Sequence, residues 1–163
     1  MGAVVKNAQR IIMLPGWSSA VGVSCPADAT EDILATLAIP AGIMGLNGIL
    51  RVSTRWSHTG SVNAKTLRHR LGGIGGTAYQ LSAAGATDIA HAAQVWIQNR
   101  NAANSQIGHI SAAGASGFGP STAAHTTGAI DTSIAQTLVL TGQKASAGET
   151  LTLESYFLEL ITP

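Results

Sequence analysis

Residues 50–57 alternate without exception between two kinds of side chain. One side of the segment carries Leu50, Val52, Thr54 and Trp56, and the other carries Arg51, Ser53, Arg55 and Ser57. Successive residues of a β-strand point to opposite faces of its sheet, so this period of two predicts a half-buried strand. The chain is therefore expected to build a sheet with one covered face and one polar face.

The same texture recurs along most of the chain, with Gly, Pro and Asn turn signals between the strands. Residues 66–71 repeat the pattern, with Leu67, His69 and Leu71 opposite two arginines. We expect strands at 33–39, 50–57, 66–71, 77–81, 90–98, 106–112, 135–141 and 150–161. A loop is expected over 113–127 and a turn over 142–148. About eight strands at regular spacing, with no long helix, predict an antiparallel jelly-roll β-sandwich.

Two strands carry further signals about which residues share a face. In the first strand, Ile33, Ala35, Leu37 and Ile39 are expected to share one face. The last strand is apolar on both faces in its second half, which is typical of a strand between two covered layers or at a subunit interface. Glu154 and Glu159 are five residues apart in it, so they are expected on opposite faces and cannot form a glycosidase pair on their own.

Residues 1–30 differ from the rest because they contain Pro15 and Pro26 and show no sustained period. We interpret them as an extended N-terminal arm with a short strand or two, one of them over 11–14, ahead of a sandwich domain at 31–163. The arm has too many apolar residues for a solvated tail. We therefore expect it, with Ile11, Ile12 and Trp17, to dock on the main domain or on a partner.

Charged residues make up only 10% of the 163 residues, against about 25% in an average soluble domain, and the formal net charge is +1. A nucleic-acid binder usually has a basic excess, so none is expected. No apolar run reaches the ~20 residues that span a bilayer, and we predict neither a membrane segment nor a signal peptide. A surface with so few charged residues suits a protein that is partly covered by neighbouring proteins.

No residues are grouped in a pattern that predicts catalysis, a metal or a cofactor. The single cysteine, Cys25, has no local activation signature. The histidines lack metal-ligand spacing, and His69 is interpreted as a core or interface histidine. Gly73, Gly75 and Ala78 match a loose dinucleotide fingerprint, but residues 77–81 have the pattern of a strand rather than a helix, so a turn is preferred. No G-x-S-x-G elbow occurs. An enzyme is not predicted.

Arginine is the only charged residue type with a pattern. Arg51, Arg55, Arg68 and Arg70 are expected to point outward from two strands that are neighbours in sequence and to share one patch with few internal partners. Two interpretations stay open: a solvated face balanced by scattered acids, which also guards against edge pairing, or a contact surface that binds carboxylates. Trp56 is expected in the core. Trp96, which shares its face with glutamines, is expected to be an interface anchor or, second, a glycan platform.

Several stretches resemble a run found in small structural proteins of tailed phages and prophages. The matching residues are 39–52, Trp56-Ser57, 63–73, 96–101, 130–132 and 151–156. The resemblance covers roughly residues 31–162 and leaves out the first ~30. His69 stands where such strands usually carry an aliphatic residue. The resemblance implies a virion protein with a jelly-roll domain, commonly trimeric, of the capsid decoration, head-fibre or tail-fibre type, with no catalytic residues.

These expectations lead to one preferred function and one alternative. The preferred function is a capsid decoration (cement) protein, made in the host cytoplasm, that sits on the outer capsid surface as a homotrimer. It would bind the major capsid protein, bridge neighbouring capsomers and gain avidity from its several contacts. The alternative is a head-fibre, tail-fibre or spike component that binds a receptor glycan, with its pocket around 113–127. We expect no cofactor, metal, nucleic acid or membrane partner.

Overall fold

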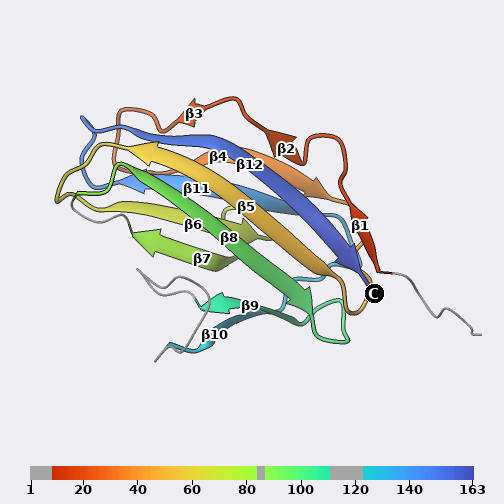
Figure 1. The fold of residues 1–163 in the computed structure, drawn as a ribbon. Helices are drawn as coiled ribbons and strands as arrows, with labels where there is room; N and C mark the ends of the chain where they lie inside the picture. The colour runs from red at the N-terminus through yellow and green to blue at the C-terminus, as the bar shows by residue number, and fades with distance from the viewer. Residues whose placement is uncertain (1–8, 84–86, 111–122) are drawn as a thin grey trace, which may run out of the picture.

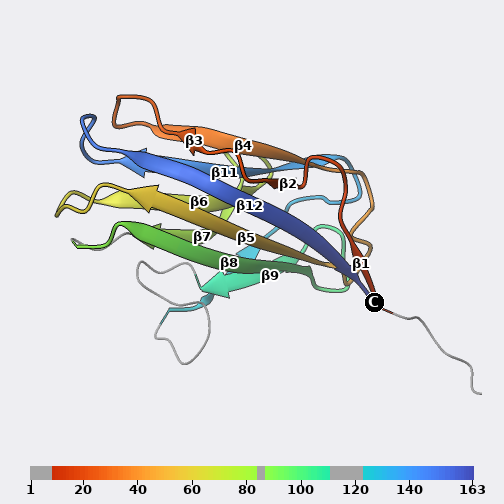
Figure 2. The ribbon, with the colours of Figure 1, turned by 45° about the horizontal axis from the view of Figure 1, so that its top comes forward.

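The computed structural model describes residues 9–83, 87–110 and 123–163, and these form twelve β-strands. Figure 1 shows the strands in two layers, and Figure 2 shows the same layers after a 45° turn. The strands are β1 (Arg10–Ile12), β2 (Ser18–Ser19), β3 (Val23–Ser24), β4 (Glu31–Ile39), β5 (Ile49–His58), β6 (Lys65–Leu71), β7 (Thr77–Ala83), β8 (Ala90–Asn99), β9 (Gln106–Ile110), β10 (His125–Gly128), β11 (Gln136–Lys144) and β12 (Leu151–Thr162).

The strands pair in a nested order. β1, β2 and β3 pair with β12, β4 pairs with β11, β5 with β8, and β6 with β7, all antiparallel. One sheet has eight strands, with β12, β5 and β8 at its centre, and the other has four in the order β4-β11-β6-β7. When β1–β3 are counted as one interrupted strand, this first strand pairs with the last strand, the second with the one before the last, and so on inward to the hairpin of β6 and β7. This is the jelly roll, so the predicted fold class is confirmed.

The additional strands are local features around this framework. β9 and β10 continue the larger sheet beyond β8. A loop was predicted over 113–127. Residues 111–122 lie outside the described residues, and the remaining part of the predicted loop contains most of β10. The turn predicted from residue 142 is wrong at its start, because β11 continues to Lys144.

Residues 9–30 are the interrupted edge strand of the larger sheet. The predicted short strand over 11–14 is present as β1, with Ile11 opposite Ile161 of β12. Trp17 is 1% exposed, and its indole Nε1 donates a 2.8 Å hydrogen bond to the Ala38 carbonyl of β4. The boundary predicted at residue 30 thus falls between the edge strand and the next strand of the sandwich.

The core lies between the two sheets, as the alternation predicts. Leu50, Val52 and Trp56 of β5 are buried against the inner face of the four-stranded sheet, where Leu138 and Leu140 of β11 also join the core. Apolar area removed from water contributes about 25 cal/mol per Å² and is the main stabilising term of such a sandwich.

His69 lies inside this core, on the inner face of β6. It is fully buried, and its Nε2 lies 3.1 Å from the hydroxyl of Thr54 on β5, in the opposite sheet. Trp56 Nε1 donates to the same hydroxyl at 2.9 Å. His69 is therefore a hydrogen-bonded core residue that links the layers, in agreement with one of its two interpretations.

Two of the β-bulges change predicted faces. The register between β4 and β11 shifts at Leu140, so Leu34 is buried whereas Ile33 is 48% exposed. The prediction that Ile33 shares a face with Leu37 and Ile39 is therefore wrong. A second shift lies between Leu153 and Ser155 on β12. A bulge adds one residue to one strand and moves the face of every residue before it relative to those after it.

Candidate functional site

The four arginines do not form one patch, so that prediction is wrong. Arg51 and Arg55 lie on β5 in the eight-stranded sheet, and Arg68 and Arg70 lie on β6 in the four-stranded sheet. The chain crosses from one layer to the other between β5 and β6, so the outward faces of these two strands point to opposite sides of the sandwich. The two pairs must be considered separately.

Arg68 and Arg70 are held by an internal carboxylate. Arg70 binds Glu31 through two hydrogen bonds, from Nε to Oε1 at 2.8 Å and from Nη2 to Oε2 at 3.0 Å. Arg68 lies 3.4 Å from the same carboxylate and donates to Gln143 at 3.0 Å. The Thr141 hydroxyl also donates to Glu31 at 2.5 Å.

This network lowers the pKa of Glu31. Burial alone would raise that pKa, but the hydrogen bonds from Arg70 and Thr141 and the charges of both arginines outweigh it. A carboxylate that accepts this many donors has little capacity left for another molecule. Arg68 and Arg70 on β6 therefore have a structural role, which is to stabilise the four-stranded sheet.

On the other side of the sandwich, Arg51 and Arg55 contribute to what we call the β5 face, the outward face of β12, β5 and β8. Arg51 is bound to Glu159 at 2.6 Å. Arg55 is exposed, and its side chain makes no ion pair or hydrogen bond with the described residues. Three registered rows of side chains form the centre of the face: Glu159–Arg51–Trp96, Phe157–Ser53–Gln94 and Ser155–Arg55–Ala92.

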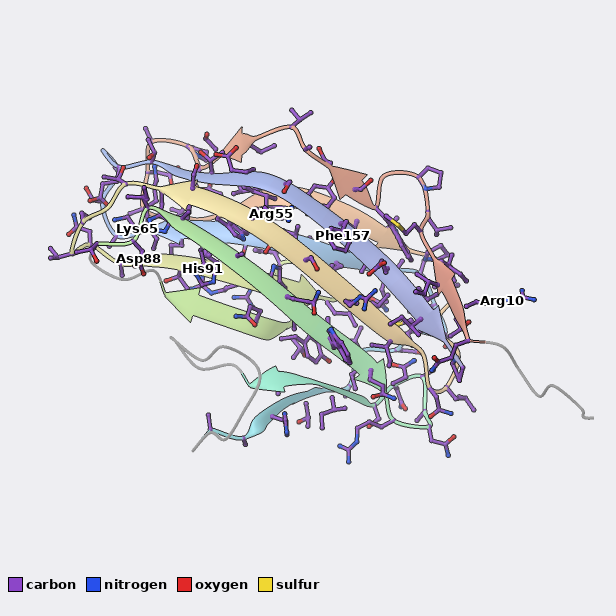
Figure 3. The ribbon with its side chains drawn as sticks, viewed as in Figure 1. Arg10, Arg55, Lys65, Asp88, His91 and Phe157 are labelled. Carbon is purple, nitrogen blue, oxygen red and sulfur yellow. The ribbon has the colours of Figure 1, made fainter. Side chains whose placement is uncertain are left out.

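The middle of the β5 face is hollow because its residues there are small. A shallow depression of about 300 Å³ lies over Ser53, Ala92 and Ser155, with Arg55, Gln94 and Phe157 also lining it. Figure 3 shows Arg55 and Phe157 over the same part of the sheet. Gln94 donates to Ser53 at 3.1 Å, so part of the polar lining is already satisfied within the chain.

The three tryptophans have different positions. Trp56 is in the core, as predicted. Trp96 is 37% exposed on the β5 face, where its indole Nε1 donates to Gln94 at 3.2 Å. Trp17, which was expected with Ile11 and Ile12 to dock on the main domain or on a partner, packs inside the chain's own sandwich, in agreement with the first alternative.

The two isoleucines of the predicted interface are on β1. Ile11 is 62% exposed beside Ile161, and Ile12 is half-buried against the core. Ile11 thus extends the exposed apolar surface at the edge of the larger sheet.

Glu154 and Phe157 are members of the β5 face that the sequence pattern does not assign to it. Glu154 was expected on the face opposite to Glu159, and this is wrong because the bulge before Ser155 turns its side chain outward. It accepts a hydrogen bond from Ser57, an outward residue of β5. The signal for Phe157 was present in the doubly apolar second half of its strand, but which face it takes depends on the bulge.

The buried ionisable groups at one end of the sandwich have structural partners. The Lys65 ammonium is fully buried and lies 2.9 Å from Glu149, and it donates to Ser61 at 2.7 Å. Hydrogen bonds from Ser61, Lys65 and Asn63 lower the pKa of Glu149 to about 2. The neighbouring Lys144 donates to the carbonyls of Pro26 and Glu149 at 2.7 and 2.9 Å.

Reactive chemistry is not favoured at the cysteine. Cys25 is buried, and burial together with the nearby Asp32 raises the pKa of its thiol to about 11. A thiol that holds its proton this tightly is a poor nucleophile.

Among residues 9–83, 87–110 and 123–163, no group of three His, Cys, Asp or Glu side chains is placed to hold a metal ion. In the same part of the chain, no helix is long and apolar enough to cross a membrane.

Comparisons with known proteins find distant likeness among solved structures. No protein-family model matches the chain, and no curated protein does. Among solved structures, the chain is similar to one titled "Structure of infectious bursal disease virus Gx strain", with a TM-score of 0.32 and 11% sequence identity. The match covers 96% of this chain and 41% of that chain, so this protein spans about two fifths of the other.

Proposed function

We propose that this chain is a structural protein of a virus particle and acts as a capsid decoration protein. It would bind the major capsid protein on the outer surface of the capsid, as a trimer, and hold neighbouring capsomers together. It would carry out no catalysis and would bind neither nucleic acid nor a membrane.

The observation that carries this proposal is the β5 face. It is a broad sheet surface with an exposed tryptophan, a partly exposed phenylalanine and small side chains between them. Exposed aromatic groups beside apolar surface are typical of protein–protein contacts, where Trp is enriched among the residues that dominate binding. The low overall charge of the chain and its resemblance to phage structural proteins support the same role.

Mechanically, such a protein works through many weak contacts. Each copy contributes a modest interface, and a trimer that engages three sites at once turns the second and third contacts into intramolecular events. The sandwich suits this role because its two sheets bury a continuous core and can transmit load without rearrangement.

The experiment has two measurements. Quantitative mass spectrometry of virions from the genome that encodes the chain gives its copy number relative to the major capsid protein. Co-sedimentation then tests whether the purified chain binds capsids that lack it. We expect a copy number comparable with that of the capsid protein and saturable binding. A chain absent from virions that also fails to pellet with capsids contradicts the proposal.

The alternative is a fibre or spike component that binds a glycan. The hollow favours it in one respect, because Arg55, Gln94 and Phe157 combine a cation, an amide and an aromatic ring over a space of about 300 Å³. A few copies per virion, together with binding of the purified chain to soluble acidic sugars, would favour this alternative. The loop expected to form the glycan pocket lies mostly outside the described residues.

A further inference from the structure

We propose that the β5 face is where this chain binds a second copy of itself. The inference rests on the trimer of the proposed function and deepens it, because it assigns the contact to one face and to named side chains. The charges, the shape and the size of that face support it.

The charges on the β5 face are balanced within a single copy. Arg51 and Glu159 neutralise each other at 2.6 Å. What remains is one cation, Arg55, and one carboxylate, Glu154, and neither makes an ion pair with a described residue. Opposite charges on one face allow two copies to exchange reciprocal contacts. A strongly acidic or basic partner would match one of these charges and repel the other.

The shape of the face is also self-complementary. Trp96 is exposed on β8. The hollow lies over Ala92, four residues earlier on the same strand, and over the small residues Ser53 of β5 and Ser155 of β12. Its volume of about 300 Å³ leaves room for the ring system of an indole. The Trp96 side chain of one copy can therefore fill the hollow of the next copy.

The face is large enough for a stable contact. Strands of ten residues span about 33 Å, and three neighbouring strands cover about 14 Å. The resulting sheet area is about 460 Å² before the relief of the side chains is counted. A standard interface buries about 800 Å² on each partner, so the β5 face provides more than half of that area.

A projection and a hollow at different places on one face permit a closed ring. When Trp96 of each copy enters the hollow of the next copy, the two surfaces in contact differ and the contact is heterologous. Three copies then form a closed ring if each is rotated by 120° relative to the one before it. Reciprocal insertion between two copies would give a dimer instead. Trp96 and the hollow are used in both cases, whereas the reciprocal contact of Arg55 with Glu154 belongs to the two-fold arrangement. The surface can therefore be tested separately from the symmetry.

The test is sedimentation velocity of the full chain over a range from about 1 to 100 μM. We expect concentration-dependent association of the native protein. Arg55→Glu places two carboxylates in the contact and should weaken association at least tenfold, as should Glu154→Arg. The double variant exchanges the charges and should restore it. Trp96→Ser should abolish association, because the hollow then loses its occupant.

Two matched controls change similar groups away from this face. Arg10→Glu reverses a charge at the edge of the molecule, where Figure 3 shows Arg10 well away from Arg55 and Phe157. Ile74→Ser removes an exposed apolar group from the turn between β6 and β7. Both variants should associate as the native chain does. Circular dichroism of every variant checks that the fold is kept.

Some results would overturn the inference. A native chain that stays monomeric at 100 μM would do so, and so would association that Trp96→Ser and Arg55→Glu leave unchanged. A double variant that associates no better than the single variants would overturn the pairing of Arg55 with Glu154.

Failure of this inference can be told apart from failure of the proposed function. Capsid co-sedimentation of a monomeric chain would leave the decoration role standing and move the inter-subunit contact elsewhere. Association through the β5 face without any capsid binding would do the reverse.

Discussion

At the scale of single residues, the arginines show that an exposed position in the sequence pattern does not mean a free side chain. Arg70 and Arg55 both alternate with apolar residues on a strand. One makes a bidentate ion pair and the other makes none among the described residues. The difference lies in the surrounding strands. Arg70 reaches the Glu31 carboxylate of β4, on the far side of β11, whereas Arg55 lies opposite Ser155 of β12.

This difference gives a prediction for stability. Arg70→Ala should lower the free energy of unfolding by about 1–3 kcal/mol, because Glu31 then keeps its partly buried charge without its main partner. Arg55→Ala should change it by less than about 0.5 kcal/mol, as is usual for surface substitutions. Urea unfolding at pH 7 measures both. Equal effects of the two substitutions would mean that the Glu31 network does not stabilise the sheet.

A second prediction concerns pH. Burial, and then the neighbouring His58, lower the pKa of His91, whereas Asp88 raises it by a smaller amount. The unfolded chain therefore binds a proton at this site more readily than the folded chain. Stability should be complete above the ordinary histidine pKa of about 6.5 and should fall as the pH drops below it.

The measurement is urea unfolding of the native chain and of His91→Gln at several values between pH 5 and 8. The native chain should lose stability towards pH 5 more steeply than the variant. Parallel pH profiles would show that His91 does not contribute. Above pH 5, the carboxylates with lowered pKa values, Glu31 and Glu149, stay ionised and do not confound the comparison.

At the scale of elements, the N-terminal segment is a strand of the jelly roll that prolines and short turns interrupt. Its short pieces give no period, which is why the sequence suggests an arm. The pairing with β12 and the burial of Trp17 are tertiary properties that the local sequence does not reveal.

The segment should therefore contribute strongly to stability. Trp17→Ala should lower the free energy of unfolding by about 3–5 kcal/mol, the usual range for a large aromatic side chain removed from a core. Ile11→Ala, in the same segment but exposed, should cost much less. Guanidinium unfolding compares them. If Trp17→Ala proves as mild as Ile11→Ala, the segment is peripheral to the fold.

The strands themselves were predictable where one face is polar and the other apolar. β5 and β6 are predicted within a residue or two, because their alternation records their burial directly. The bulges were not predictable, since an extra residue in a strand leaves no mark on composition. They decide that Leu34 replaces Ile33 in the core and that Glu154 joins Glu159 on the outer surface. Of the residues on the β5 face, the sequence analysis therefore identified Arg51, Arg55 and Trp96 as candidates. It missed Glu154 and Phe157.

At the scale of the whole molecule, association should stabilise the fold. If copies bind each other only when folded, the midpoint of thermal unfolding must rise with protein concentration, because mass action favours the bound state. We expect a higher midpoint at 100 μM than at 1 μM for the native chain and no such change for Trp96→Ser. Differential scanning calorimetry and fluorimetry cover the two concentrations. A midpoint independent of concentration in the native chain would contradict self-association.

The nested pairing also determines the order in which the fold can form. β12 lies between the edge strand and β5 in the larger sheet, yet it comes last of the twelve strands along the chain. During synthesis, the edge strand has no partner and β5 has an open side until residues 151–162 leave the ribosome. Such long-range pairing makes folding slow and leaves strand edges exposed in the meantime. Productive folding therefore has to wait for the last strand, and a nascent chain that pauses before residue 151 is the form most prone to aggregate.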